Sequence, residues 1–148
     1  MKTIKPKDIS YWLQEHFFYG VCYMANTRAR VAQVLSKLPE KVQETLLQPT
    51  VYFCCFSPDA STVTEISYVC LPHQEVKRTP CTLIVLGASL ERQNKKEAMA
   101  SIGHEIAHYY LGHSTGGTTH PQNEKAAWAL ASEWGFSCPE KEGKSVDD

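Results

Sequence analysis

The chain lacks long apolar runs, Cys-x-x-Cys pairs and an excess of charge of either sign. No stretch approaches the roughly 18 apolar residues that a membrane span needs, so we expect no membrane partner. Its 15 lysines and arginines nearly balance its 16 aspartates and glutamates, which argues against a broad nucleic-acid-binding face. Asp8 and Ser10 stand where a signal peptide would have its apolar region. These features predict a cytoplasmic protein.

The composition is that of a globular domain. Hydrophobic residues make up 43% of the 148 residues and charged residues 21%, which excludes a disordered or low-complexity chain. The length fits one domain, which we place at 1–138 with a charged tail at 139–148. The six cysteines are expected to be buried thiols rather than disulfides, because a reducing compartment disfavours bridges.

Periodicity predicts an α+β fold with N-terminal helices and a small three-stranded sheet. Helical spacing begins near Lys7, in a segment reaching about Tyr23, and two more helices should follow. Asn26 or Thr27 can cap the first of these two, and Pro39 can open the second. The predicted strands are 50–56, 62–71 and 81–86. A short turn-like link favours a hairpin between the first two, and the third should be buried on both faces.

Two helices complete the predicted chain. Asn94 can cap the first, with Glu97 three residues later, and Gly112 is well placed to end it. The second begins near Pro121 and stops at Gly135. Gly103, inside the first helix, costs about 1 kcal/mol relative to alanine, which a close-packing requirement would explain.

The first of these helices contains the pattern His-Glu-x-x-His. His104 and His108 lie four residues apart and therefore project from one face, one turn apart. Two imidazoles at this spacing can bind one Zn²⁺ ion. Glu105 lies about 100° further around the helix, where it can reach a water molecule on the metal without binding the metal. This arrangement makes Glu105 the candidate general base.

A catalytic zinc site needs a third protein ligand and one open position. We favour Glu124, in the first turn of the last helix, whose face continues through Ala127, Trp128 and Ala131. The small residues on that face would let the two helices approach closely. His120 and His113 are the alternatives. His113 lies about 140° around the helix from His108 and would point away unless Gly112 breaks the helix.

The segment from His104 to His113, followed by Glu124 and the pair Trp128-Ala129, resembles the ImmA/IrrE family of small zinc metallopeptidases. The similarity extends from Leu83 to about Gly135. It implies a zincin-like fold with an active-site helix and a C-terminal glutamate helix. It also implies site-specific cleavage of a regulatory protein as the activity.

These patterns together predict a zinc metallopeptidase that acts on a protein or peptide substrate. Zinc would be held by His104, His108 and Glu124, and Glu105 would take a proton from the attacking water. The oxyanion donor stays open among Tyr109, Tyr110, His113 and His120. Two other hypotheses are a non-catalytic zincin-like binding module and a zinc amidohydrolase with a non-peptide substrate. The oligomeric state is not predicted.

Overall fold

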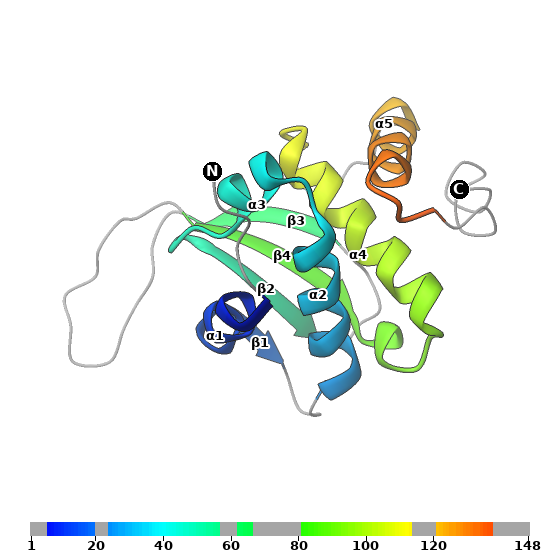
Figure 1. The fold of residues 1–148 in the computed structure, drawn as a ribbon. Helices are drawn as coiled ribbons and strands as arrows, with labels where there is room; N and C mark the ends of the chain where they lie inside the picture. Colours follow the sequence, from blue (N-terminus) through cyan, green and yellow to red (C-terminus); the bar gives the residue numbers. More distant parts are fainter. Residues whose placement is uncertain (1–5, 20–23, 57–61, 67–80, 114–120, 138–148) are drawn as a thin grey trace.

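The computed structural model describes residues 6–19, 24–56, 62–66, 81–113 and 121–137. These residues form an α+β fold (Figure 1). In chain order its elements are α1 (Pro6–His16), β1 (Phe17–Tyr19), α2 (Ala25–Lys37), α3 (Glu40–Leu46), β2 (Val51–Phe56), β3 (Thr62–Ile66), β4 (Cys81–Gly87), the 3-10 helix η1 (Ala88–Glu91), α4 (Lys95–Tyr110) and α5 (Pro121–Glu133).

The strands of the described residues form one sheet in the order β1-β2-β4-β3. Strands β1, β2 and β4 are mutually parallel, and β3 runs antiparallel to β4. The predicted hairpin between β2 and β3 is therefore wrong, because β4 lies between them. A short link permits two strands to pair but does not require it. β4, which is more apolar than β3, lies between β2 and β3.

The prediction of three strands missed β1. Phe17–Tyr19 follows α1 directly and pairs with Phe53–Cys55 of β2. Its three residues are too few to show a strand period, and pairing with β2 outweighs the local helical pattern. The segments predicted at 50–56 and 81–86 are confirmed as strands. The segment predicted at 62–71 is a strand over 62–66, and its remainder lies outside the described residues.

The core lies between one face of the sheet and the helices. Phe53 of β2 and Ile84 of β4 are paired in register and fully buried on this face. Their sequence neighbours Tyr52 and Leu83 are only partly buried on the other face. The expectation that β4 is buried on both faces is confirmed only in part, because Cys81 on that other face is buried whereas Leu83 and Val85 are of intermediate burial. Figure 1 shows α2 and α4 in front of the sheet and α5 beside α4.

Glu91 of η1 holds the beginning of α2. Its carboxylate accepts hydrogen bonds from the backbone N–H of Asn26 at 2.9 Å and of Thr27 at 2.8 Å, and from the Thr27 hydroxyl at 2.9 Å. The helix begins at Ala25, so the prediction that Asn26 or Thr27 is its cap is wrong. A carboxylate from elsewhere in the chain satisfies the N-terminal donors instead.

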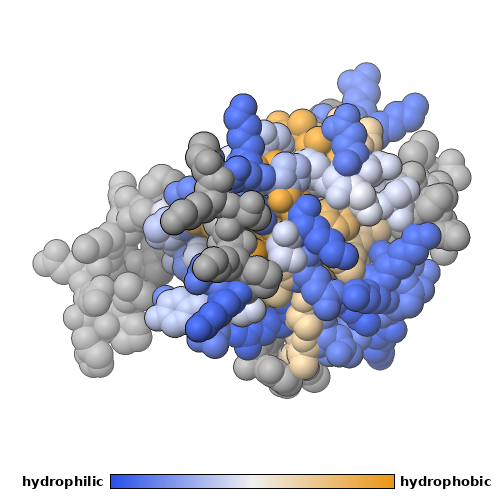
Figure 2. Space-filling view, in the orientation of Figure 1, coloured by the Kyte–Doolittle hydropathy of each residue, from blue (hydrophilic) through white to orange (hydrophobic). Residues whose placement is uncertain are grey.

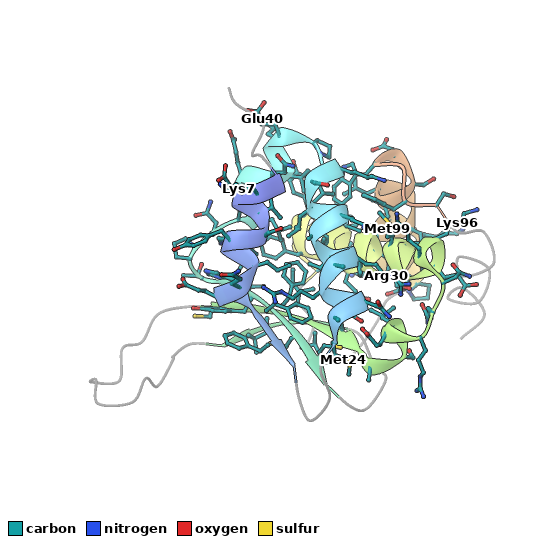
Figure 3. All side chains as sticks on the ribbon, turned by 60° about the horizontal axis from the view of Figure 1, so that its bottom comes forward. Lys7, Met24, Arg30, Glu40, Lys96 and Met99 are labelled. Atoms are coloured by element: carbon teal, nitrogen blue, oxygen red, sulfur yellow. The ribbon has the colours of Figure 1, made fainter. Side chains whose placement is uncertain are left out.

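Arg30 makes a second connection from α2 to the segment that enters α4. Its guanidinium donates to the carbonyl oxygens of Leu90 at 3.1 Å and Gln93 at 2.8 Å. Figure 3 shows Arg30 on α2 beside the first turns of α4, where Lys96 and Met99 are labelled. The N-terminal end of α4 is thus fixed against α2 by two charged side chains.

The surface agrees with a globular domain. Figure 2 shows hydrophilic residues over much of the described surface in view, with apolar residues visible mainly in the spaces between them. Among the described residues, no helix has the length and apolar character to cross a bilayer. Cys54, Cys55 and Cys81 are buried and are not part of a disulfide, as predicted. Cys22, Cys70 and Cys138 lie outside the described residues.

Candidate metal centre

The helix α4 carries the two histidines, and local signals fix both of its ends. Asn94 caps the start, since its side-chain oxygen accepts a hydrogen bond from the Glu97 N–H at 2.9 Å. Gly112 follows the last turn with φ +77°, a conformation that favours glycine. Both signals were predicted from the sequence and are confirmed. The helix is buried on nearly every side between Ala98 and His108, so polar residues there need a specific reason.

His104 and His108 project from α4 to the same place. Their Nε2 atoms are 3.1 Å apart, and their rings meet nearly edge to face at 81°. Each residue is about 93–94% buried. The i, i+4 spacing on a regular helix produces this arrangement.

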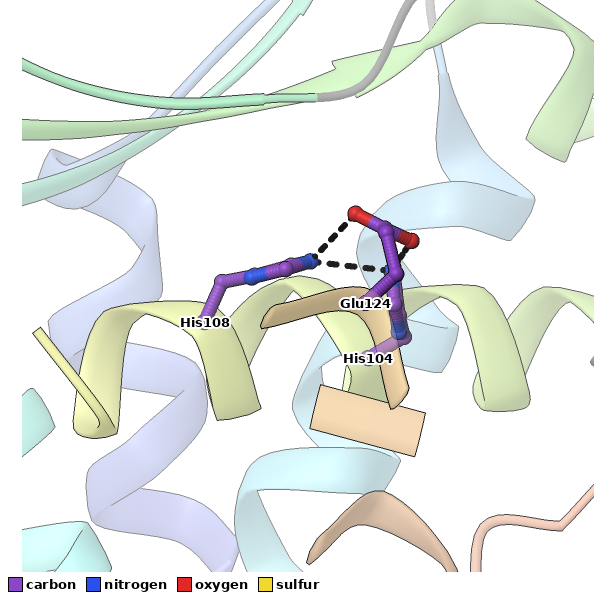
Figure 4. Close-up of side chains that lie close together, drawn as sticks. All are labelled: His104, His108 and Glu124. Atoms are coloured by element: carbon purple, nitrogen blue, oxygen red, sulfur yellow. Dashed lines mark hydrogen bonds and ion pairs between the residues drawn. The ribbon is translucent and has the colours of Figure 1, made fainter. Parts of the chain in front are cut away.

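Glu124 approaches the two histidines from α5. Its Oε2 lies 3.0 Å from His104 Nε2, and its Oε1 lies 2.9 Å from His108 Nε2. Figure 4 shows the three side chains converging from the two helices. Ala127 and Ala131 of α5 are fully buried, which agrees with the expectation that small residues let α5 pack closely. The structure therefore brings together the three residues predicted as zinc ligands.

The three side chains form a cluster that can hold a metal ion. Two imidazole nitrogens and a carboxylate oxygen are a donor set typical of catalytic zinc sites. Ligand atoms around a tetrahedral zinc ion with bonds of ~2.0–2.1 Å lie about 3.3 Å apart. The two Nε2 atoms are 3.1 Å apart, and each lies 2.9–3.0 Å from a different oxygen of the Glu124 carboxylate, so small shifts would bring one oxygen and both nitrogens to this spacing. The residues therefore fit zinc.

The two glutamates near the cluster have opposite electrostatic environments. Burial alone would raise the pKa of Glu124, but the hydrogen bonds and charges of His104 and His108 outweigh it and lower this pKa to about 2. Burial is the main cause that raises the pKa of Glu105 to about 7; the charge of His108 opposes this shift and the charge of Glu124 adds to it. Glu124 is therefore ionised at neutral pH and suited to bind a cation. Glu105 can gain and lose a proton there.

Trp128 supports the cluster from α5. Its ring stacks on His104 with centroids 4.0 Å apart and planes 24° apart. The sequence reading placed Trp128 on the Glu124 face of α5 but did not assign it this contact. Its position four residues after Glu124 was the available signal, because that spacing puts both side chains over the same part of α4.

The close-packing reason for Gly103 is also visible. A Cβ atom at Gly103 would lie 2.9 Å from Cδ2 and 3.0 Å from Cβ of Phe136. Phe136 is 5% exposed and follows Gly135, whose φ is +93°. The glycine thus lets the segment after α5 pack directly on α4, next to His104.

The two candidate tyrosines have their described contacts outside the His104, His108 and Glu124 cluster. The Tyr109 hydroxyl donates to the carbonyl oxygen of Thr45 in α3 at 3.1 Å, so a role for it as an oxyanion donor is not supported. Tyr110 is 38% exposed, and its ring meets that of Trp134 edge to face. His120 lies outside the described residues.

His113 lies beside the cluster but is not one of its donors. Its Nδ1 is 3.1 Å from His108 Nδ1, the ring nitrogen opposite the one that faces Glu124. Burial and the charge of His108 lower the pKa of His113. The charge of Glu124 raises it but does not outweigh them. The sequence prediction treated His113 as an alternative ligand or oxyanion donor, and the geometry favours neither.

Comparisons with known proteins add no relative, since no family model, no curated protein and no solved structure matches this chain.

Proposed function

We propose that the protein is a zinc-dependent metallopeptidase of the zincin type. The observation that carries the proposal is the convergence of His104, His108 and Glu124 within hydrogen-bonding distance of one another, beside a second buried carboxyl group. Burying these polar groups is costly unless they are paired or bind an ion. A metal site supplies a reason for the arrangement that packing alone does not.

In this proposal His104, His108 and Glu124 hold the ion and Glu105 carries the proton. A bound zinc ion would activate a water molecule and polarise the scissile carbonyl group. Glu105 accepts the proton of the attacking water and later delivers it to the leaving amine. Burial suits Glu105 to this task, because it disfavours the ionised form and so helps the carboxylate to take up a proton.

The substrate would bind as an extended peptide along β3. Within the residues that the structure describes, β3 forms one edge of the sheet and contacts α4. An extended chain can add to such an edge through main-chain hydrogen bonds. This binding mode brings a peptide bond close to the helix that carries Glu105. A protein segment in extended conformation is therefore the proposed substrate, and a regulatory protein, as the ImmA/IrrE resemblance implies, is one candidate.

The test combines zinc content with proteolysis. Wild type, Glu105→Gln and the matched control Glu133→Gln, at an exposed residue of α5, would be measured for zinc per chain and for cleavage of fluorescein-labelled casein and a fluorogenic peptide library. We expect about one zinc per chain in all three. Loss of the general base should reduce cleavage by about 10²–10⁴-fold in Glu105→Gln alone.

Four outcomes would overturn the proposal. Absence of zinc binding by the wild type would remove the metal centre. Zinc binding with cleavage that is equal in wild type and Glu105→Gln would remove the catalytic role. Zinc binding with no cleavage by the wild type would favour the binding module, and hydrolysis of a panel of acylated amines alone would favour the amidohydrolase.

A further inference from the structure

His113 is brought back over α4 by the way in which that helix ends. The His113 N–H donates to the His108 carbonyl oxygen at 2.9 Å, and the Gly112 N–H donates to the Tyr109 carbonyl oxygen at 3.1 Å. With Gly112 at φ +77°, these two bonds form a Schellman motif. The chain reverses there instead of continuing around the helix. The ring of His113 consequently lies 5.3 Å from that of His108, measured between centroids.

The two nitrogens of His108 face different partners. Its Nε2 lies 2.9 Å from Glu124 Oε1 and 3.1 Å from His104 Nε2, whereas its Nδ1 lies 3.1 Å from His113 Nδ1. An imidazole that gives Nε2 to a metal ion carries its proton on Nδ1 and needs an acceptor for it. Two Nδ1 atoms at hydrogen-bonding distance require one donor and one acceptor. With zinc on Nε2, the donor is then His108 and the acceptor is His113.

We propose that His113 is a positioning residue that accepts the Nδ1 proton of His108 and so fixes the ring and tautomer of that histidine for zinc binding. This role rests on the metal centre of the proposed function. His113 itself does not touch the ion, because it lies across the His108 ring from the donor atoms. In the sequence, this role depends on the glycine-histidine pair at 112 and 113. Gly112 lies four residues after His108, where it can form the Schellman motif that turns His113 back toward His108.

The first test needs no substitution. In the zinc-loaded wild type with ¹⁵N-labelled histidine, long-range ¹H–¹⁵N spectra report which ring nitrogen carries each proton. We expect His108 protonated at Nδ1, and His113 protonated at Nε2 with a bare Nδ1. A proton on Nδ1 of His113 would overturn the proposal.

The second test compares substitutions at this position. His113→Leu removes the acceptor, His113→Asn keeps an acceptor oxygen near the place of Nδ1, and Leu111→Ala is the control at an exposed residue of the same turn. Zinc affinity, measured by competition with a chromophoric chelator, should fall about 10–100-fold in His113→Leu. It should stay close to the wild-type value in the other two variants.

The outcomes separate this role from the proposed function. A wild-type chain that takes up no zinc overturns both. A wild type and a His113→Leu variant that bind zinc equally well overturn the positioning role alone. Equal weakening in His113→Leu and His113→Asn also overturns it, because the effect would then come from lost packing and not from a lost acceptor.

Discussion

The two sides of α4 differ in what holds them. Ile102 and Ile106 lie on one side, fully buried in the main core, where burial itself is favourable. His104 and His108 lie roughly opposite, at about 100° per residue, and are almost as deeply buried. Burial there is unfavourable without partners. The apolar side therefore stabilises the fold. The histidine side buries a polar cluster at a cost in free energy that the apolar side offsets.

The largest effect on stability is expected from the apolar side. Ile106→Ala should lower the free energy of unfolding by about 2–5 kcal/mol, because it removes buried methyl groups and leaves a cavity. Denaturant unfolding measures this loss, and Ile106→Val should lose only about 0.5–1.5 kcal/mol. Zinc content per folded chain should stay unchanged in both. A loss of zinc from the folded Ile106→Val variant would show that the two sides are not separable.

Removing the metal should reveal what the histidine side contributes. Zinc bound only to the folded chain stabilises it by about 2.7 kcal/mol when free zinc is at 100 times its Kd. Chelation should therefore lower the melting temperature of the wild type. The His108→Ala variant should melt at the same temperature with or without zinc. If the melting temperature of the wild type did not change on chelation, the histidine side would not be a metal site, and the proposed difference between the two sides would be contradicted.

The same contrast explains what the sequence could predict. His104, Glu105 and His108 share one helix, whose period alone fixes their relative directions. The Asn94 cap and the Gly112 stop are likewise local signals, and both are confirmed. Glu124 was predicted from its face of small residues, and α5 does bring it to the histidines.

Features set by distant parts of the chain were missed. β1 exists because Phe17–Tyr19 pairs with β2, and the position of β3 depends on β4 occupying the place beside β2. Glu91 replaces the predicted cap of α2 from about 65 residues away. Each outcome depends on competition between partners that a sequence period does not describe.

Gly103 lies between the two sides, and a substitution there should disturb the packing of α5. The added methyl group of Gly103→Ala meets Phe136 at 2.9–3.0 Å, and such overpacking costs about 1–3 kcal/mol. Alanine recovers about 1 kcal/mol as a better helix former, so we expect a net loss of about 0–2 kcal/mol. In a Phe136→Leu background the same substitution should be less destabilising. An equal loss in both backgrounds, measured by denaturant unfolding, would mean that the ring does not cause it.

An effect of similar, small size concerns Glu91, which supports the apolar side through α2. Glu91→Gln keeps the shape of the side chain but weakens its acceptance of the Asn26 and Thr27 N–H groups. The loss should be about 0.5–2 kcal/mol at neutral pH, the range for helix caps. Zinc affinity should not change, because the substitution lies outside the cluster.

The pH dependence of that loss identifies its origin. Burial would raise the pKa of Glu91, but the hydrogen bonds from Asn26 and Thr27 and the charge of Arg30 outweigh it and hold this pKa below its ordinary value of 4.5. A carboxyl group with a lowered folded-state pKa contributes stability that is complete above 4.5 and disappears as the pH falls through the folded pKa. The difference between wild type and Glu91→Gln should therefore be constant near neutral pH and shrink below pH 4.5. A difference that stays constant down to pH 3, in unfolding measured along a pH series, would assign the loss to packing of the side chain. The stabilisation that Glu91 gives to α2, and through α2 to the packing against α4, would then not be electrostatic.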